Sequence, residues 1–186
     1  MNHKSTIDIE SDRLLLRRFV PEDIPLAFKN WTSDDEVTKY LTWPSHKDLS
    51  VTEAVIGDWI KSYSDPSFYQ WAIVLKDLGE PIGSISVVNA DEEVEILEIG
   101  YCVGRKWWNM GYTSEAFKAI IPFLFEEVKA KKILAKHIPE NPGSGRVMQH
   151  VGLKKEGQLR RVHKTNYGIN DLIYYGLLAE EYFANK

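Results

Sequence analysis

The segment from Val94 to Ile138 constrains the fold more than any other part of the sequence. Residues 94–103 predict a long strand and residues 131–138 a second one, and residues 114–130 between them repeat apolar side chains at helical spacing. A strand–helix–strand connection nearly always forms a right-handed crossover between parallel strands. Pro122 lies inside the helix and should kink it or end its first half.

Further strands flank this unit and are expected to pair antiparallel. Residues 70–75 and 81–88 enclose a turn-prone stretch, which predicts a hairpin, and Lys154–His163 with Asp171–Leu178 predict another. The other expected elements are a strand at Arg13–Phe19, a helix at 21–31, a helix after the capping-box spacing Ser50–Glu53, and a short helix at 144–153 stopped by Gly152. The predicted fold class is α/β (α+β): a mixed, mostly antiparallel twisted sheet with helices on both faces.

Length and composition indicate one ordinary globular domain, residues 1–186, with a core from about 11 to 180. The formal net charge of −4 argues against a non-specific nucleic-acid binder. The single cysteine allows no intrachain disulfide and favours a reducing compartment. No apolar run approaches membrane-spanning length, so we expect a cytoplasmic protein with neither a membrane nor a nucleic acid as partner. The five histidines lack metal-ligand spacing, so no metal is expected.

The loop between the strand and the long helix suggests an anion site. The helix begins near Thr113, where the first N–H groups have no partner within the helix and the helix dipole is positive. Gly111 permits close approach of a ligand or a positive φ. The segment is not a P-loop, because the glycine-lysine-serine/threonine ending is absent, and one glycine does not make a dinucleotide fingerprint. A purely structural turn remains an alternative.

The stretch from Glu98 to Phe117 resembles the acetyl-CoA-binding segment of the GNAT superfamily, and within it the ribosomal-protein N-terminal acetyltransferase group. There, a glutamate-isoleucine-glycine-tyrosine strand leads to a tryptophan-glycine-x-glycine-tyrosine-x-threonine-glutamate-alanine loop and helix. The residues that match or are conservative replacements are Glu98, Ile99, Gly100, Tyr101, Trp108, Gly111, Tyr112, Ser114, Glu115 and Ala116. The chain departs from the broader superfamily pattern at Trp108, Asn109 and Thr113. Backbone amides make most pyrophosphate contacts in this family, so these changes are compatible with binding.

A second stretch, residues 141–157, resembles the family's asparagine-x-x-serine-x-arginine-valine segment and the glycines that follow it. Met148 stands where many members carry a tyrosine. The resemblance implies a GNAT-like acyl-CoA N-acyltransferase fold with acetyl-CoA as co-substrate. The cofactor-binding residues it implies are Tyr101, Cys102, Val103, Trp108, Asn109, Met110, Gly111, Tyr112, Thr113, Ser114, Asn141, Ser144 and Arg146. Either Trp107 or Trp108 is expected to shape the loop by packing.

In this family the amine attacks the thioester directly, so positioning and electrostatics carry much of the catalysis. The resemblance makes Glu98 the candidate general base. Strand alternation places Glu98 and Cys102 on one face and Tyr101 and Val103 on the other. A glutamate in so apolar a strand is costly unless it is paired or functional. A place at the wet edge of the sheet, or a structural hydrogen bond, remains the alternative role.

Ser144 is the candidate that hydrogen-bonds or protonates the departing thiolate, because Met148 cannot act as an acid. Its alternative role is a helix N-cap or first-turn serine. Asn141 would bond the pantetheine amides or form a turn before Pro142, and backbone N–H groups of residues 101–103 would polarise the thioester carbonyl. Cys102 is expected to be a small core residue rather than a nucleophile.

The leading functional hypothesis is an acetyl-CoA-dependent N-acetyltransferase acting on a primary amine, either a protein N-terminal residue or a small molecule. The alternative is a non-catalytic acyl-CoA-binding or sensing module on the same fold. Homodimerisation is common among relatives, but nothing in the sequence identifies an interface. An aromatic set comes from the region that lines the acceptor cleft in relatives; most of its members are expected to be core residues and a subset to line the cleft: Trp31, Tyr40, Trp43, Phe68, Tyr69 and Trp71.

Overall fold

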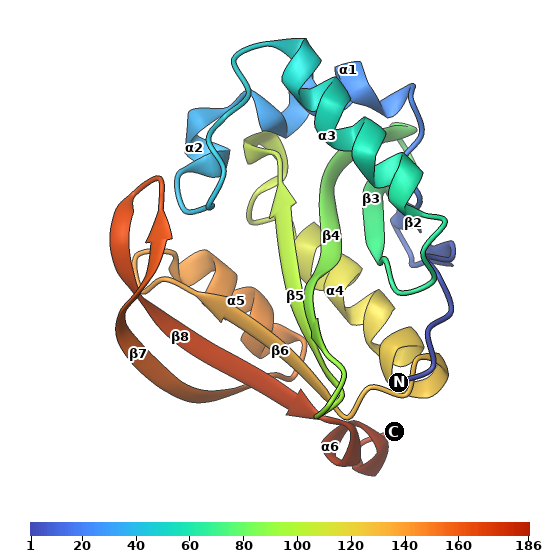
Figure 1. Cartoon of the computed structure of the whole chain (residues 1–186), viewed down its shortest axis with the longest axis vertical. Helices are drawn as coiled ribbons and strands as arrows, with labels where there is room; N and C mark the ends of the chain where they lie inside the picture. The colour runs from blue at the N-terminus through green and yellow to red at the C-terminus, as the bar shows by residue number, and fades with distance from the viewer.

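A computed structural model describes all residues from Met1 to Lys186. Its centre is one eight-stranded sheet with the order β1-β2-β3-β4-β5-β6-β8-β7 (Figure 1). The strands are β1 (Ile9–Glu10), β2 (Leu14–Arg17), β3 (Gln70–Leu75), β4 (Glu80–Asp91), β5 (Ile96–Val103), β6 (Lys132–His137), β7 (Lys154–Thr165) and β8 (Gly168–Leu178). Only β5 and β6 pair parallel, which confirms the predicted crossover and the mixed, mostly antiparallel sheet.

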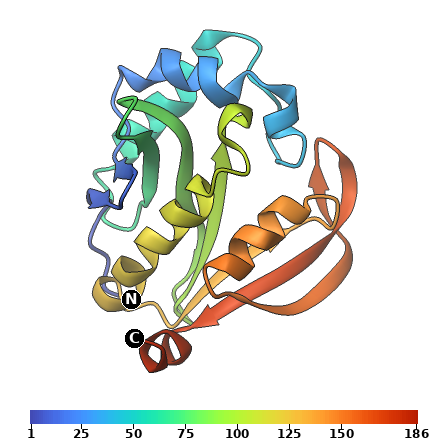
Figure 2. The ribbon, with the colours of Figure 1, turned by 180° about the vertical axis from the view of Figure 1, so that it is seen from behind.

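Helices cover both faces of the sheet, as predicted. Helices α1 and α3 lie on the face seen in Figure 1, and α4 and α5 lie on the face seen in Figure 2. The α-helices are α1 (Asp23–Ala27), α2 (Asp35–Thr38), α3 (Leu49–Ser62), α4 (Tyr112–Pro122), α5 (Pro142–His150) and α6 (Ala179–Ala184). Two π-helical segments, η1 (Phe28–Thr32) and η3 (Phe123–Glu127), continue α1 and α4, and η2 (Arg105–Trp107) is a 3₁₀ turn.

The sheet separates two apolar cores. The larger core includes Leu97, Ile99 and Val103 of β5 together with the buried side of α4, and the smaller core packs α1 and α3 on the opposite face. Cys102 contacts the smaller core. The predicted alternation of side chains along β5 is therefore confirmed.

Several boundaries differ from the sequence prediction. The prediction of Ser50 as the helix cap is wrong: α3 starts two residues earlier, with Asp48 as its N-cap, and Asp48 accepts a hydrogen bond from the Ser50 N–H at 2.8 Å. Asp48 can serve as the N-cap in place of Ser50, because aspartate caps a helix as well as serine does and Asp48 also precedes the apolar face of the helix. Pro122 ends the α-helical part of its helix as predicted, and the chain continues as the π-helical turn η3. The short elements β1, α2 and α6 carry too little periodicity to be predicted.

The final hairpin is longer than predicted, because β7 extends to Thr165 and β8 already begins at Gly168.

No helix of the structure is long and apolar enough to cross a membrane.

Candidate active site

The parallel strands β5 and β6 separate like the arms of a fork. Their pairing covers only residues Ile96–Glu98 against Lys132–Leu134. Beyond Glu98, β5 continues to pair with β4 as far as Val103, but no strand pairs with its other side. Figure 1 shows the two strands meeting at the lower end and diverging upward. We call the space between them the fork.

The open side of β5 presents unpaired backbone groups to the fork. The Gly104 N–H donates to the Ile82 carbonyl on β4, so alternate residues of β5 direct their polar groups toward β4. Tyr101 and Val103 belong to the other alternate set, so their backbone N–H and C=O groups point away from β4 and into the fork. The Val103 carbonyl accepts the indole N–H of Trp108 at 2.7 Å. The N–H groups of Tyr101 and Val103 thus remain available, whereas Cys102 directs its N–H toward β4, so the prediction for residues 101–103 holds for two of the three.

The loop before α4 supplies a second set of free amides. The six consecutive N–H groups from Asn109 to Ser114 donate no hydrogen bond within the chain. Asn109 has φ 60° and Gly111 has φ 81°, both in the left-handed region. Because Gly111 is the N-cap of an eleven-residue helix, the amides lie at the positive end of its dipole. This arrangement suits a phosphate or pyrophosphate group.

Two charged side chains hold this loop in place. The Arg13 guanidinium donates to the Met110 carbonyl at 3.0 Å and to Glu115 at 2.6 Å, and it lies 4.2 Å from the centre of the Tyr112 ring. Glu115 also accepts from the Ser11 hydroxyl at 2.7 Å. The loop is thus tied to the turn between β1 and β2.

We expect the Glu115 contacts to weaken in acid. Burial alone would raise the pKa of the Glu115 carboxyl, but hydrogen bonds from the Arg13 N–H, Ser11 and the Arg13 guanidinium outweigh burial, and the net pKa is lowered below 4.5. A lowered folded-state pKa contributes stability above the unfolded value that is lost as pH falls through the folded value. Urea unfolding should therefore show Glu115→Gln less stable than wild type at pH 7, with the difference shrinking below about pH 4.5. A stability difference between Glu115→Gln and wild type that is as large in acid as at pH 7 would contradict this assignment.

Glu98 lies at the base of the fork and is buried. Its two carboxylate oxygens lie 2.9 and 3.0 Å from the Lys136 ammonium, and its side chain is 10% exposed. The glutamate is therefore paired and does not lie at a wet edge. Lys136 projects from β6 on the same face of the sheet as Glu98, because Glu98 is in register with Leu134.

Helix α5 begins beside the fork and brings Ser144 against β5. The Tyr101 phenol lies 2.9 Å from the Ser144 hydroxyl and donates to the Ser144 carbonyl at 3.1 Å. Burial raises the pKa of the Tyr101 phenol, so this group stays protonated and can donate. Asn141 is the N-cap of α5 and accepts the Ser144 N–H at 3.3 Å, so Ser144 lies in the first turn and is not the cap. The Asn141 amide nitrogen donates no hydrogen bond within the chain.

The remaining predicted residues are placed as follows. Burial raises the pKa of the Cys102 thiol, whose sulfur lies 3.5 Å from the Ser84 hydroxyl, which fits a core thiol rather than a nucleophile. Arg146 is exposed on α5 and makes no ion pair. Trp107 is buried at 7% exposure, whereas Trp108 is 42% exposed. Trp107 is therefore the tryptophan that packs the loop onto the core.

Comparison with known proteins identifies the family to which this chain belongs. The sequence matches the acetyltransferase (GNAT) domain over residues 13–154. The chain belongs to the GNAT acetyltransferase family. The uncharacterized N-acetyltransferase p20 of Bacillus licheniformis is 33% identical over 176 residues, which cover 92% of this chain and 96% of that protein.

Solved GNAT structures share the fold. The acetyltransferase (GNAT family) from Bacillus anthracis superimposes with a TM-score of 0.82 at 28% identity, covering 94% of this chain and 100% of the other. RimL, a ribosomal L7/L12 alpha-N-protein acetyltransferase in complex with coenzyme A, gives a TM-score of 0.84 at 17% identity, covering 94% and 99%. The fold predicted from the sequence is thus that of the GNAT enzymes.

A bridge spans the open end of the fork in this GNAT domain (Figure 1). At the tip of the β7–β8 hairpin, the Asn166 N–H donates to the Leu41 carbonyl at 3.0 Å, and its side-chain amide donates to the Trp43 carbonyl at 2.7 Å. Tyr167 meets Tyr40 edge to face at 5.6 Å between ring centres. Tyr40 and Trp43 are half-buried beside this bridge. The other members of the aromatic set include Trp31, Tyr69 and Trp71, which are buried core residues.

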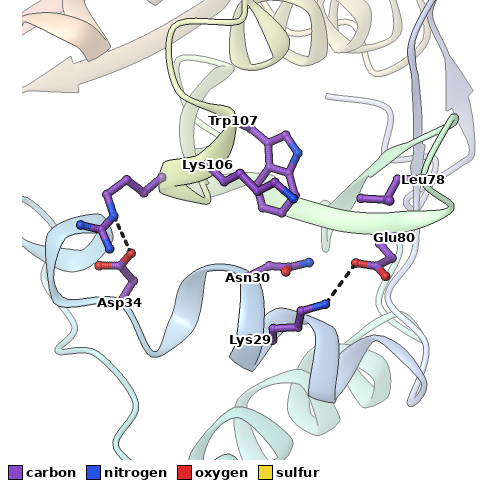
Figure 3. A pocket seen from close by; sticks show the side chains of 8 residues that line it. Lys29, Asn30, Asp34, Leu78, Glu80, Lys106 and Trp107 are labelled. Carbon is purple, nitrogen blue, oxygen red and sulfur yellow. Dashed lines mark ion pairs between the residues drawn. The ribbon is translucent and has the colours of Figure 1, made fainter.

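A cavity of about 480 Å³ lies away from the fork. Its walls come from η1, the β3–β4 turn and η2, and it contains none of the predicted site residues (Figure 3). Ion pairs join Arg105 to Asp34 at 3.0 Å and Lys29 to Glu80 at 3.9 Å across it. Because it lies away from the fork and contains none of the predicted site residues, we assign it no part in the GNAT chemistry.

Sequence reasoning missed three groups at the site. These are Lys136, the Arg13 side chain and the phenol of Tyr101, which was assigned only through its backbone. Lys136 belongs to an alternating strand, so the lysine could have been placed on a face, but its partner depends on the register of β5 against β6. No local pattern encodes that register.

Proposed function

We propose that the protein is an acetyl-CoA-dependent N-acetyltransferase that transfers the acetyl group to a primary amine by direct attack on the thioester. The single observation that best supports it is the run of free amides from Asn109 to Ser114 beside the open edge of β5. The coenzyme A complex of the structural neighbour RimL agrees with this co-substrate. In our proposal, the loop amides bind the pyrophosphate, and Asn141 and the β5 edge bind the pantetheine arm.

Each chemical step has a candidate group at the fork. Glu98 accepts the proton of the attacking amine, directly or through a water. The N–H groups of Tyr101 and Val103 stabilise the negative charge that develops on the carbonyl oxygen. The Ser144 hydroxyl, backed by the protonated Tyr101 phenol, hydrogen-bonds or protonates the departing thiolate. No acyl-enzyme is required, and Cys102 takes no part.

The proposal is tested by incubating the protein with acetyl-CoA and a panel of amines, and measuring release of the free coenzyme A thiol. The panel contains peptides with free N-termini, amino acids, polyamines and aminoglycosides, because the acceptor is either a protein N-terminal residue or a small molecule. Thiol release with at least one amine is expected. Silence across the panel, with acetyl-CoA still bound, would favour the non-catalytic binding module.

Replacing Gly111 with alanine should weaken acetyl-CoA binding about tenfold. Its φ of 81° costs a residue with a Cβ roughly 1–2 kcal/mol, and a Cβ there would meet only Arg13 at 3.5 Å, so strain rather than collision is introduced. The free loop relaxes from this conformation and must return to it to bind. Titration calorimetry with acetyl-CoA measures the change.

Gly152→Ala is the matched control for Gly111→Ala. Gly152 also has a positive φ, 92°, and open space around its Cβ position, but it ends α5 and presents no amides to the fork. This variant should lose a similar amount of stability and keep its affinity for acetyl-CoA. Equal losses of affinity in the two variants would show that the loop amides are not the binding site.

A further inference from the structure

Lys136 has an environment that no other lysine of the chain shares. Its ammonium is bound by both oxygens of Glu98, the group to which we assign the proton of the incoming amine. The Lys136 ammonium makes no other hydrogen bond or ion pair. A primary amine of the protein therefore already occupies the place where the acceptor amine has to deliver its proton.

The register of β5 and β6 places Lys136 just beyond the point where the two strands separate. Glu98 pairs with Leu134, and two residues further along each strand lie Gly100 and Lys136. Lys136 is thus on the arm of the fork that faces the free N–H groups of Tyr101 and Val103. Its side chain is 28% exposed, so the side chain is accessible to solvent.

We propose that Lys136 is itself an acetyl acceptor, so that the enzyme acetylates its own active-site lysine when no other amine is present. This inference rests on the proposed function. Glu98 takes a proton from the Lys136 ammonium, and the neutral amine attacks the thioester carbonyl of acetyl-CoA. The new N–C bond forms, the C–S bond breaks, and coenzyme A leaves as the thiol after taking up a proton. One acetyl group is consumed and one amide is made, with no other reactant.

Acetylation of Lys136 would change the charge and the free space around Glu98. Acetyl-Lys136 carries no positive charge, so the Glu98 carboxylate loses its only ionic partner while remaining nearly buried. The neutral side chain also fills the space at the base of the fork. We therefore expect the acetylated protein to turn over external amines more slowly than the unmodified protein does.

Lys132 is the matched internal control. It lies on the same strand and the same face as Lys136, is also held by a glutamate, Glu156, at 2.7 Å, and has a similar exposure of 22%. Glu156 belongs to β7, away from the fork. Spontaneous chemical acetylation should label the two lysines similarly, whereas transfer within the site should label only Lys136.

The test incubates the purified protein with acetyl-CoA and no added amine, and follows acetylation of each lysine by peptide mass spectrometry. We expect Lys136 to be labelled at least about tenfold faster than Lys132. The fraction labelled per molecule should be independent of protein concentration, and labelling should fall to the Lys132 rate in Glu98→Gln. Equal labelling of the two lysines, or labelling of Lys136 that is unchanged in Glu98→Gln, would overturn the inference.

Thermal unfolding with acetyl-CoA separates this inference from the proposed function. A rise in melting temperature without selective labelling of Lys136 overturns the self-acetylation alone. No rise overturns the assignment of the cofactor, and the self-acetylation with it. The same measurement on Glu98→Gln checks that this variant is folded and still binds acetyl-CoA, so that its loss of labelling reports on chemistry.

Discussion

Replacing Glu98 with glutamine is expected to lower kcat/KM for the amine acceptor by about 100-fold or more, while acetyl-CoA affinity stays unchanged. A positioned general base contributes about 10²–10⁴-fold in rate, and glutamine keeps the size of the side chain but cannot accept the proton. Glu98 lies at the base of the fork, whereas the amides assigned to the pyrophosphate belong to residues 109–114. Steady-state kinetics with the best amine of the panel, together with calorimetric titration of acetyl-CoA, measure the two quantities separately.

Glu156→Gln is the control for Glu98→Gln. It removes a carboxylate that also pairs with a lysine of β6, Lys132, but outside the fork. Its kcat/KM should remain close to that of the wild type. If Glu98→Gln also stayed within about threefold of wild type, loss of an ion pair would account for both variants, and Glu98 would not be the base.

Replacing Trp107 with alanine should destabilise the fold by about 3–5 kcal/mol, the usual cost of emptying a buried aromatic site. Its ring is 7% exposed, belongs to the larger core, and lies so close to Gly104 that a Cβ there would approach it to 2.8 Å. The cavity would open directly beneath the loop before α4. Urea unfolding measures the loss.

The neighbouring Trp108→Ala is the control for Trp107→Ala. Trp108 is 42% exposed and contributes mainly the hydrogen bond from its indole to the Val103 carbonyl, so about 1 kcal/mol is expected. Equal losses in the two variants would contradict the assignment of Trp107 as the packing residue.

Local patterns in the sequence predicted much of the fold. Strand geometry fixes a side-chain period of two, so the sequence alone identified which side chains of β5 share a face of the sheet. The apolar spacing of residues 114–130 and the position of Gly111 placed α4 and its N-terminus within two residues. These features depend on neighbours in sequence, and the motifs that resemble the GNAT family lie on the same elements.

The pairings at the site could not be predicted in this way. The contact of Glu98 with Lys136, of Tyr101 with Ser144, and of Asn166 with the carbonyls near α2 joins elements far apart in the chain. Each depends on strand register or on how far the fork opens. Amino-acid periodicity specifies the face on which a side chain lies but not its partner across a sheet.

The most direct test of the central assignment is thermal unfolding of the wild-type protein with and without acetyl-CoA. A ligand that binds only the folded state adds about 2.7 kcal/mol of stability at about a hundred times its dissociation constant. Our account predicts a clear rise in melting temperature, reduced in Gly111→Ala and retained in Gly152→Ala. An unchanged melting temperature of the wild type at millimolar acetyl-CoA would contradict the assignment of the loop amides to coenzyme A.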